Sequence, residues 1–369
     1  MSDLDFNAAA ARGRQQRLLA EMQKQRLDLV IVQSIEHVQY LTGARFGWVF
    51  SPAAALRSDG HLTLVAPRKA LQDAAADEIL PYEAQWHSTL RNDQRAASSE
   101  VLLKSLQDHW SPKRIGVEYS CFTSHLTKLA GERIDIEPTL YRLRRRKDPD
   151  ELARIKKAIA GTGKMYALAR QIIEPGITEL DVFNRLQAAA VAEFGEMLTG
   201  TGNDYACGER GGPPRNGRKA QAGELYILDL GPAFRGYFAD NCRAFSVDRK
   251  PTDTQQTAWS YIMKTFQHIE ATVRPGKNCQ ELFFECQGIL ADAPEGVFNH
   301  HLGHGIGLFP HETPHLNPYW NETFEVGDVF TCEPGLYDEP ILKAGMRIEN
   351  DYLVTPTGIE NLSPFPMEL

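Results

Sequence analysis

Hydrophobic and polar positions follow two different periods along residues 1–145. Residues 11–26 are charged and show the spacing of an amphipathic helix. Short apolar runs then predict three buried strands, at residues 29–32, 61–65 and 114–118. Helix and strand patterns that alternate in this way are typical of an α/β domain.

A domain boundary is predicted near residues 141–150. There the basic run RLRRRK leads into Asp148, Pro149 and Glu151. Asp148 suits a helix N-cap, Pro149 suits the first helical position, and Glu151 can return a hydrogen bond to the cap. A basic run can bind nucleic acid, but at a domain joint a solvated face is the more common outcome. We therefore expect two domains, residues 1–145 and 146–369.

The second predicted domain repeats a pattern. Pro-Gly at 175–176 and at 275–276 is followed each time by a capping residue, Thr178 or Asn278, and three positions later by an acidic residue. A strand hairpin with two acidic residues lies downstream of each. These residues are Asp229 and Asp240 in the first hairpin, and Glu333 and Glu349 in the second. The self-similarity predicts two related half-domains that close on each other and gather the four carboxylates.

The four acidic residues lie among apolar ones, which raises an electrostatic problem. Ionised carboxylates are rarely buried without a cation or a hydrogen-bonding partner. Two divalent metal ions with bridging carboxylates would satisfy all four. Five of the eleven histidines lie between residues 300 and 315, and glycines at 303, 305 and 307 allow close backbone approach around His304. A single acidic residue beside glycine is usually a turn residue, so the metal-site prediction rests on the joint pattern.

A zinc-protease signature in the same segment is rejected. Residues 311–315 read HETPH, which matches HExxH. That motif binds zinc only on a helix, where both histidines share one face. Pro314 lies inside the motif and Pro310 and Pro318 flank it, so no uninterrupted helix is expected.

Composition narrows the class of protein. The 369 residues are 42% hydrophobic and 24% charged, an ordinary globular balance, and the net charge of −8 argues against nucleic acid as the main partner. The six cysteines are scattered singly, which predicts neither a disulfide framework nor a thiolate zinc site. The acidic start and the lack of a long apolar stretch predict no signal peptide and no membrane span, hence a cytoplasmic location.

As a set, the motifs resemble the pita-bread metallohydrolases of peptidase family M24, which include methionine aminopeptidase, aminopeptidase P, prolidase and creatinase. The motifs are DLG at 229–231, YFAD at 237–240, HHLGHGIG at 300–307, EPG at 333–335 and RIEND at 347–351. Residues 27–32 and 40–43 are similar to the extra domain of the prolidase and creatinase branch. The resemblance implies an α+β protein, with an N-terminal creatinase-like α/β domain before a pseudo-two-fold pita-bread catalytic domain.

The same resemblance implies a set of metal ligands. Asp229 would bind one divalent ion, and His304 and Glu333 the other. Asp240 and Glu349 would bridge the two ions. Manganese, zinc, cobalt or iron suits such a mixed oxygen and nitrogen site, and the sequence does not choose among them.

Catalytic roles are implied for further residues. A metal-activated hydroxide would attack an amide carbonyl, and Glu333 would pass the proton to the leaving nitrogen. His311 matches a histidine that steadies the tetrahedral intermediate, and His300 matches one on the substrate side. Arg347 would stand beside the second bridging acid and orient it.

The implied function is that of a metal-dependent hydrolase similar to Xaa-Pro dipeptidases and aminopeptidases, a homodimer acting on a small peptide or amide. One alternative is a family member that hydrolyses a small non-peptide C–N bond or another small metabolite. Creatinase is a poor guide, because it works without metals and relies on a histidine absent here. A binding protein on an inactive scaffold is disfavoured, since all five ligand positions are kept.

The substrate side departs from the family pattern. The family usually has a further histidine where this chain has Gly212, and the threonines that commonly follow the second aspartate are Cys242 and Ala244. We therefore expect a poor or unusual Xaa-Pro peptidase. Another residue of the loop 199–217 can supply the missing contact. The candidates are Tyr205, Arg210 and Arg215.

Overall fold

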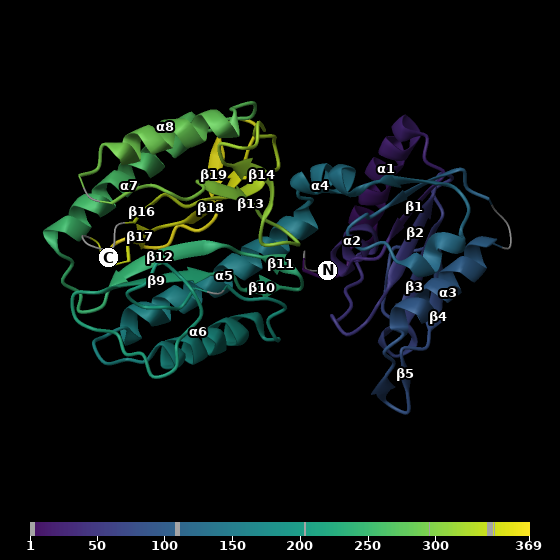
Figure 1. The fold of residues 1–369 in the computed structure, drawn as a ribbon, viewed down its shortest axis with the longest axis horizontal. Coiled ribbons are helices and arrows are strands. Elements are labelled where there is room, and N and C mark those ends of the chain that lie inside the picture. The colour runs from purple at the N-terminus through teal and green to yellow at the C-terminus, as the bar shows by residue number, and fades with distance from the viewer. Residues whose placement is uncertain (1–3, 108–110, 203, 295, 338–341, 343) are drawn as a thin grey trace. The chain divides into compact units, whose positions relative to one another are not determined.

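The computed structural model divides the chain into two units, residues 1–144 and 145–369 (Figure 1). It describes residues 4–107, 111–202, 204–294, 296–337, 342 and 344–369. No helix in these ranges is both long enough and apolar enough to cross a membrane. All six cysteines are free.

The first unit is built on a six-stranded mixed sheet. Its strand order is β4-β3-β2-β1-β7-β8, with β1, β7 and β8 parallel and β1, β2 and β3 antiparallel. The strands predicted at 29–32, 61–65 and 114–118 are confirmed as β1, β3 and β7, and the first predicted helix is α1. The elements are α1 (Ala8–Gln25), β1 (Leu29–Val32), α2 (Ile35–Thr42), β2 (Ala53–Arg57), β3 (Leu62–Pro67), β4 (Glu78–Tyr82), β5 (Gln85–Trp86), β6 (Thr89–Leu90), α3 (Gln94–Gln107), β7 (Arg114–Val117), β8 (Glu132–Asp135) and α4 (Glu137–Arg145).

A buried ionic network joins β7 to α2 in this unit. Glu118, just after β7, accepts hydrogen bonds from the backbone N–H and hydroxyl of Ser34 and lies 2.5 Å from Nδ1 of His37. Nε2 of the same histidine lies 3.0 Å from Arg144. Burial opposes ionisation of Glu118, but His37 and these hydrogen bonds outweigh it and lower the pKa of Glu118 to about 2. Glu118 is therefore a buried anion at neutral pH.

The basic run at 142–147 is only in part the solvated face that its composition predicted, because Arg142 and Arg146 are exposed but the other basic residues are not. Arg144 and Arg145 are buried, and Arg145 forms an ion pair with Asp328 at 2.7 Å. Lys147 is buried as well and pairs with Glu312 at 3.1 Å. The charges are compensated inside the protein, because a buried cation needs an anionic partner.

The second unit places two helix pairs outside a core of strands (Figure 1). β9 and β12 form one two-stranded sheet, and the order β14-β13-β15-β18-β19 forms a five-stranded one. Helix α5 begins at Pro149 as predicted, with the Asp148 N–H donating to Glu151 at 3.0 Å. The elements are α5 (Pro149–Ile172), α6 (Glu179–Phe194), β9 (Leu225–Leu230), β10 (Ala233–Phe234), β11 (Tyr237–Phe238), β12 (Asn241–Ser246), α7 (Asp253–Thr272), α8 (Cys279–Ala291), β13 (Gly303–Gly305), β14 (Glu312–Leu316), β15 (Val329–Cys332), β16 (Gly335–Leu336), β17 (Met346–Arg347), β18 (Asn350–Val354) and β19 (Ile359–Asn361).

The predicted internal repeat appears in the backbone hydrogen bonds. Thr178 caps α6 and Asn278 caps α8, each by accepting from the N–H three residues on. Gly176 N–H donates to the carbonyl of Ala220, and Gly276 N–H donates to the carbonyl of Phe324, both at 2.8 Å. Each half thus ties its Pro-Gly turn to the chain that leads into its acidic hairpin.

Each helix pair buries one side of its own strands. Side chains of α5 and α6 pack with Tyr226 and Leu228 of β9, and side chains of α7 and α8 pack with Phe330 and Tyr352 of β15 and β18. This burial fixes the register of the hairpins, because a slip by one residue would move every side chain to the opposite face of its strand and away from the core that it packs in.

We expect Glu118→Gln to destabilise the protein by about 3–5 kcal/mol at neutral pH, because removing the charge leaves the buried groups around His37 without their counter-ion. The free energy of unfolding from urea titration measures this. Glu132→Gln is the matched control, since Glu132 is 58% exposed in its pair with Arg114 and its loss should cost less than about 1 kcal/mol. Equal losses in both variants would contradict a buried network.

Candidate metal centre

The first acidic hairpin brings Asp229 and Asp240 to one end of β9 and β12. Asp229 lies within β9, opposite Cys242 of β12, and Asp240 directly precedes β12. Asp240 is thus at a strand end rather than within a strand. Both side chains are largely buried, with 18% of Asp229 and 16% of Asp240 exposed.

The second acidic hairpin has a related arrangement. Cys332 and Asn350 are paired at the ends of β15 and β18, and Glu333 and Glu349 are the next residues outward on each strand. Both side chains are buried. The N–H of Glu349 donates to the carbonyl of Cys242 at 2.9 Å, so the two hairpins are joined beside their acidic residues.

His304 enters from β13, which pairs with β14 and β15. Glycines make this approach possible, as predicted. A Cβ on Gly303 would lie 2.0 Å from the carbonyl oxygen of Thr331, and one on Gly305 would lie 2.2 Å from that of Thr313. Residues 312–315 of the rejected HExxH signature lie in strand β14 rather than in a helix, which confirms the rejection.

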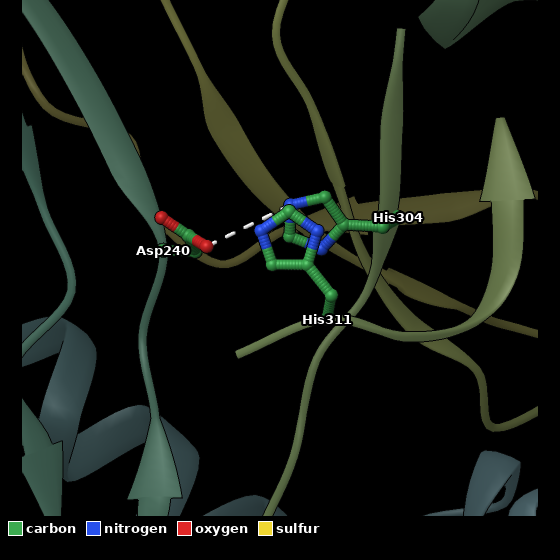
Figure 2. A group of neighbouring side chains, drawn as sticks. All are labelled: Asp240, His304 and His311. Atoms are coloured by element: carbon green, nitrogen blue, oxygen red, sulfur yellow. Dashed lines mark ion pairs between the residues drawn. The ribbon is translucent and has the colours of Figure 1, made fainter. Parts of the chain in front are cut away.

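The predicted ligand residues converge in two overlapping groups. Ligand atoms of Asp229, Asp240 and Glu349 all lie within 4.8 Å of one another, and so do those of His304, Glu333 and Glu349. Glu349 belongs to both groups. Asp240 also groups with His304 and His311, with 3.7 Å between His304 Nε2 and Asp240 Oδ2 (Figure 2).

His311 stacks on His304. The two ring centroids are 3.7 Å apart and the planes differ by 14°, so the rings face each other next to the Asp240 carboxylate (Figure 2). His300 lies beside Glu333, with Nδ1 at 3.4 Å from Glu333 Oε2. His301, which the sequence did not single out, approaches Glu333 Oε1 to 3.2 Å.

Arg347 compensates part of the negative charge. Its guanidinium donates to Asp229 at 2.8 Å and to Asp204 at 2.6 Å. Asp204 was missed by the sequence analysis, because nothing in its loop distinguishes it from a turn residue. Its other oxygen accepts from the N–H of Gly212 at 2.7 Å. Arg347 therefore ties the Gly-rich loop to the first acidic hairpin.

The remaining carboxylates have less compensation, and Arg347 comes only to 4.0 Å from Oε2 of Glu333. Oε1 of Glu333 and Oε2 of Glu349 are buried and accept no hydrogen bond. Burial raises the pKa of Glu333 to about 8. Burial first, and then the neighbouring carboxylates, raise the pKa values of Asp240 and Glu349 well above their ordinary range. A buried acceptor without a partner is costly, and bound cations would remove that cost.

His304 has the tautomer that a metal ligand needs. Its Nδ1 donates to the carbonyl of Gly305 at 3.1 Å, which leaves the Nε2 lone pair directed at the carboxylates. Burial lowers the pKa of His304 to about 4, and that of His311 likewise. Both rings are neutral at pH 7. Four carboxylates with a neutral imidazole fit a site for divalent cations.

The ligand residues line one cavity of about 600 Å³. Its wall also contains Arg210 and Gly211 from the loop before β9. The three candidates for the missing histidine contact now differ clearly. Tyr205 is fully buried and bonded to Gln187, and Arg215 is bonded to Glu179 and Glu209, so only Arg210 among the three lines the cavity.

Comparison with known proteins assigns the family. The model of metallopeptidase family M24 matches residues 153–356, and that of the creatinase/prolidase N-terminal domain matches residues 14–146. The chain belongs to metallopeptidase family M24. It is accordingly a metal-dependent peptidase with a creatinase-type N-terminal domain and a pita-bread catalytic domain, as the sequence predicted.

Relatives of this M24 peptidase include uncharacterized peptidases of staphylococci. One from Staphylococcus epidermidis is 31% identical over 63% of this chain and 66% of its own length, slightly under two thirds. One from Staphylococcus saprophyticus is 24% identical over 95% of this chain and 99% of its own length. Among solved structures, the Xaa-Pro dipeptidase from Bacillus anthracis superposes with a TM-score of 0.82 at 21% identity over 97% and 99% of the chains. The prolidase from Pyrococcus furiosus superposes with a TM-score of 0.79 at 21% identity, over 94% of this chain and 99% of the prolidase chain. These superpositions show the same fold.

The stability of metal-stripped protein should fall as the pH rises from about 7 to about 8.5. Glu333 keeps its proton in the folded state up to a pKa of about 8, whereas the unfolded chain releases it near pH ~4.3. The folded state therefore binds more protons, and each such proton contributes a loss of ~1 kcal/mol per pH unit. Urea unfolding after chelation measures this.

The titration of His304 and His311 does not affect the stability between about pH 7 and 8.5. The lowered pKa values of His304 and His311 act with the opposite sign and cost stability only as the pH falls below 6.5. In Glu333→Gln the slope between about pH 7 and 8.5 should become shallower. An unchanged slope in that variant would show that Glu333 is already ionised at neutral pH.

Proposed function

We propose that this M24 peptidase binds two divalent metal ions and hydrolyses short peptides, with Xaa-Pro bonds as the first substrate class to test. Asp229 would hold one ion, His304 and Glu333 the other, and Asp240 and Glu349 both. The observation that carries the proposal is the overlap of two ligand groups at Glu349, with buried carboxylate oxygens of Glu333 and Glu349 that accept no hydrogen bond.

When bound, two such ions acidify a water molecule and polarise the scissile carbonyl. Residues of the chain would transfer the protons in this reaction. Glu333, whose Oε1 accepts no hydrogen bond, is placed to take a proton from the nucleophile and pass it to the leaving nitrogen. His300, 3.4 Å from Oε2 of Glu333, is placed to orient that carboxyl group.

His311 is placed to stabilise charge on the carbonyl oxygen. It is exposed, it is held parallel to His304, and it is neutral at pH 7, so one ring nitrogen can donate a hydrogen bond into the cavity. A preorganised donor aimed at a developing oxyanion is among the most effective catalytic devices.

Two observations bear on the substrate. The similar solved structures include Xaa-Pro dipeptidases, prolidases and an aminopeptidase P, which supports peptides with proline after the scissile bond. Gly212 favours the alternative of a small non-peptide C–N substrate or another small metabolite, because glycine has no side chain to replace the missing histidine. Its φ of +119° and its N–H bond to Asp204 fix the backbone at that position.

The purified protein should contain close to two divalent ions per chain, and Asp240→Asn should lose both. Asp240 groups with ligands of each ion, and its replacement removes a shared negative charge. Metal analysis by mass spectrometry after loading with manganese, zinc, cobalt or iron measures this. Asp292→Asn is the control, since Asp292 is exposed at the end of α8. Two tightly retained ions in Asp240→Asn would rule out the bridging assignment.

Metal-loaded enzyme should cleave at least one peptide from a panel of Xaa-Pro dipeptides, longer Xaa-Pro peptides and non-proline amides. His311→Ala should lower kcat by ~10²–10³ with the metal content unchanged, because it removes one oxyanion donor. Steady-state kinetics and metal analysis of the same samples test both points. Cleavage confined to non-proline amides would replace the Xaa-Pro assignment, and loss of metal in His311→Ala would make His311 a ligand instead.

A further inference from the structure

We propose that Arg210 binds a carboxylate of the substrate, so that the enzyme prefers short peptides with a free carboxylate on the residue after the scissile bond. This inference rests on the proposed function and specifies its substrate class. It predicts a dipeptidase rather than an enzyme for longer chains. The argument depends on where Arg210 lies, what holds it, and which charges around it are already paired.

Arg210 lies in the wall of the cavity that contains the metal-ligand residues. Its guanidinium carbon lies 3.9 Å from the centre of the Tyr337 ring, and that ring lies 6.0 Å from the ring of His300. His300 in turn lies 3.4 Å from Glu333. A single extended residue spans ~3.5 Å, so a carboxylate on the residue after the scissile carbonyl would still lie within the cavity that Arg210 and the ligand residues share.

The guanidinium is held in place by neutral groups. Its two terminal nitrogens donate to Asn299, to the side-chain oxygen at 2.6 Å and to the backbone carbonyl at 3.0 Å. The backbone carbonyl of Arg210 accepts from Arg347 at 3.2 Å, which fixes the base of the side chain. Arginine normally loses conformational freedom when it binds a ligand, and this anchoring has already removed much of it.

None of these partners neutralises the charge of Arg210. Among the residues that the structure describes, no carboxylate lies within ion-pair distance of it, whereas Arg347 has both Asp204 and Asp229 as partners. Two divalent ions would balance the four ligand carboxylates, and Arg347 balances Asp204. Within the described part of the chain, Arg210 then remains as a positive charge on the cavity wall that no carboxylate compensates.

The loop backbone leaves this charge accessible. Gly211 follows Arg210 in the cavity wall, and a Cβ there would meet the Asp204 carboxylate at 2.3 Å, so a side chain at that position would displace a carboxylate that Arg347 and Gly212 hold. Arg210 itself is exposed. A planar guanidinium that keeps unused N–H donors binds a carboxylate well, and this suits a peptide terminus better than an amide.

The test compares substrates that differ in one charge. Metal-loaded wild-type enzyme should hydrolyse alanyl-proline about 10- to 100-fold better, in kcat/KM, than alanyl-proline amide, as expected for a hydrogen bond to a charged group. Arg210→Gln should reduce this ratio to near one, mainly by raising KM for the free acid. Arg210→Lys keeps the charge and should retain part of the preference.

Two further variants separate the charge of Arg210 from loop integrity. Asn299→Asp places a counter-ion on the anchoring residue and should lower the preference for the free acid with Arg210 intact. Arg185→Gln removes an exposed arginine of α6 outside the cavity and should leave the ratio unchanged. Circular dichroism and metal analysis show whether each variant is folded and loaded.

The panel also identifies the source of the carboxylate. A dipeptide amide with an aspartate side chain after the scissile bond carries the charge without a free terminus. If it is preferred over alanyl-proline, Arg210 binds a side-chain carboxylate rather than the terminus. An acid-to-amide ratio near one in wild type, or a ratio that Arg210→Gln leaves unchanged, would overturn the inference.

Failure of the proposed function gives a different result. If no peptide is cleaved with any metal, calorimetric binding of alanyl-proline and its amide to the metal-loaded protein still decides the role of Arg210. Tighter binding of the free acid that disappears in Arg210→Gln supports the inference without catalysis. Equal or undetectable binding of both ligands overturns it.

Discussion

Repulsion among four carboxylates that share one cavity is the constraint on which the catalytic unit depends. One of them, Asp229, has a permanent counter-ion in Arg347. The others are held together although burial and neighbouring charges favour their neutral forms. The scaffold must therefore be rigid enough to resist their separation, and the hydrogen bond from Glu349 to Cys242 and the close-packed backbone around His304 serve that end.

The duplicated architecture provides this rigidity. Each half contributes a capped helix that packs on its own acidic hairpin, and the hairpins meet at their acidic ends. Arg243 strengthens the junction. It is buried, and its guanidinium donates to the carbonyls of Cys242 and Glu349, one from each half. A site built from strand ends on two packed halves is better positioned than one built on loops.

The elements and ligand candidates could be predicted because their signals are local. Helix caps such as Thr178 depend on a few neighbouring residues, and acidic residues within apolar strands stand out against the pattern around them. Asp204 and Asn299 carry no such signal, because their roles depend on where a Gly-rich loop runs in space. For Arg210, the sequence offered three equal candidates, and only burial and ion pairing separated them. The burial of Arg145 and Lys147 in the basic run was not predicted, since their partners, such as Asp328, lie far away in the chain.

The distance in sequence between Asp229 and Glu349 has a consequence for the stability of the protein in a cell. The two halves of the site meet only in the folded chain, so metal ions bind the native state far better than the unfolded one. At a free concentration of ~100 times the dissociation constant, such binding adds ~2.7 kcal/mol of stability. The local metal concentration would then determine how often the chain unfolds and becomes accessible to proteases. A shortage of metal ions would shorten the half-life of the protein as well as abolish its activity.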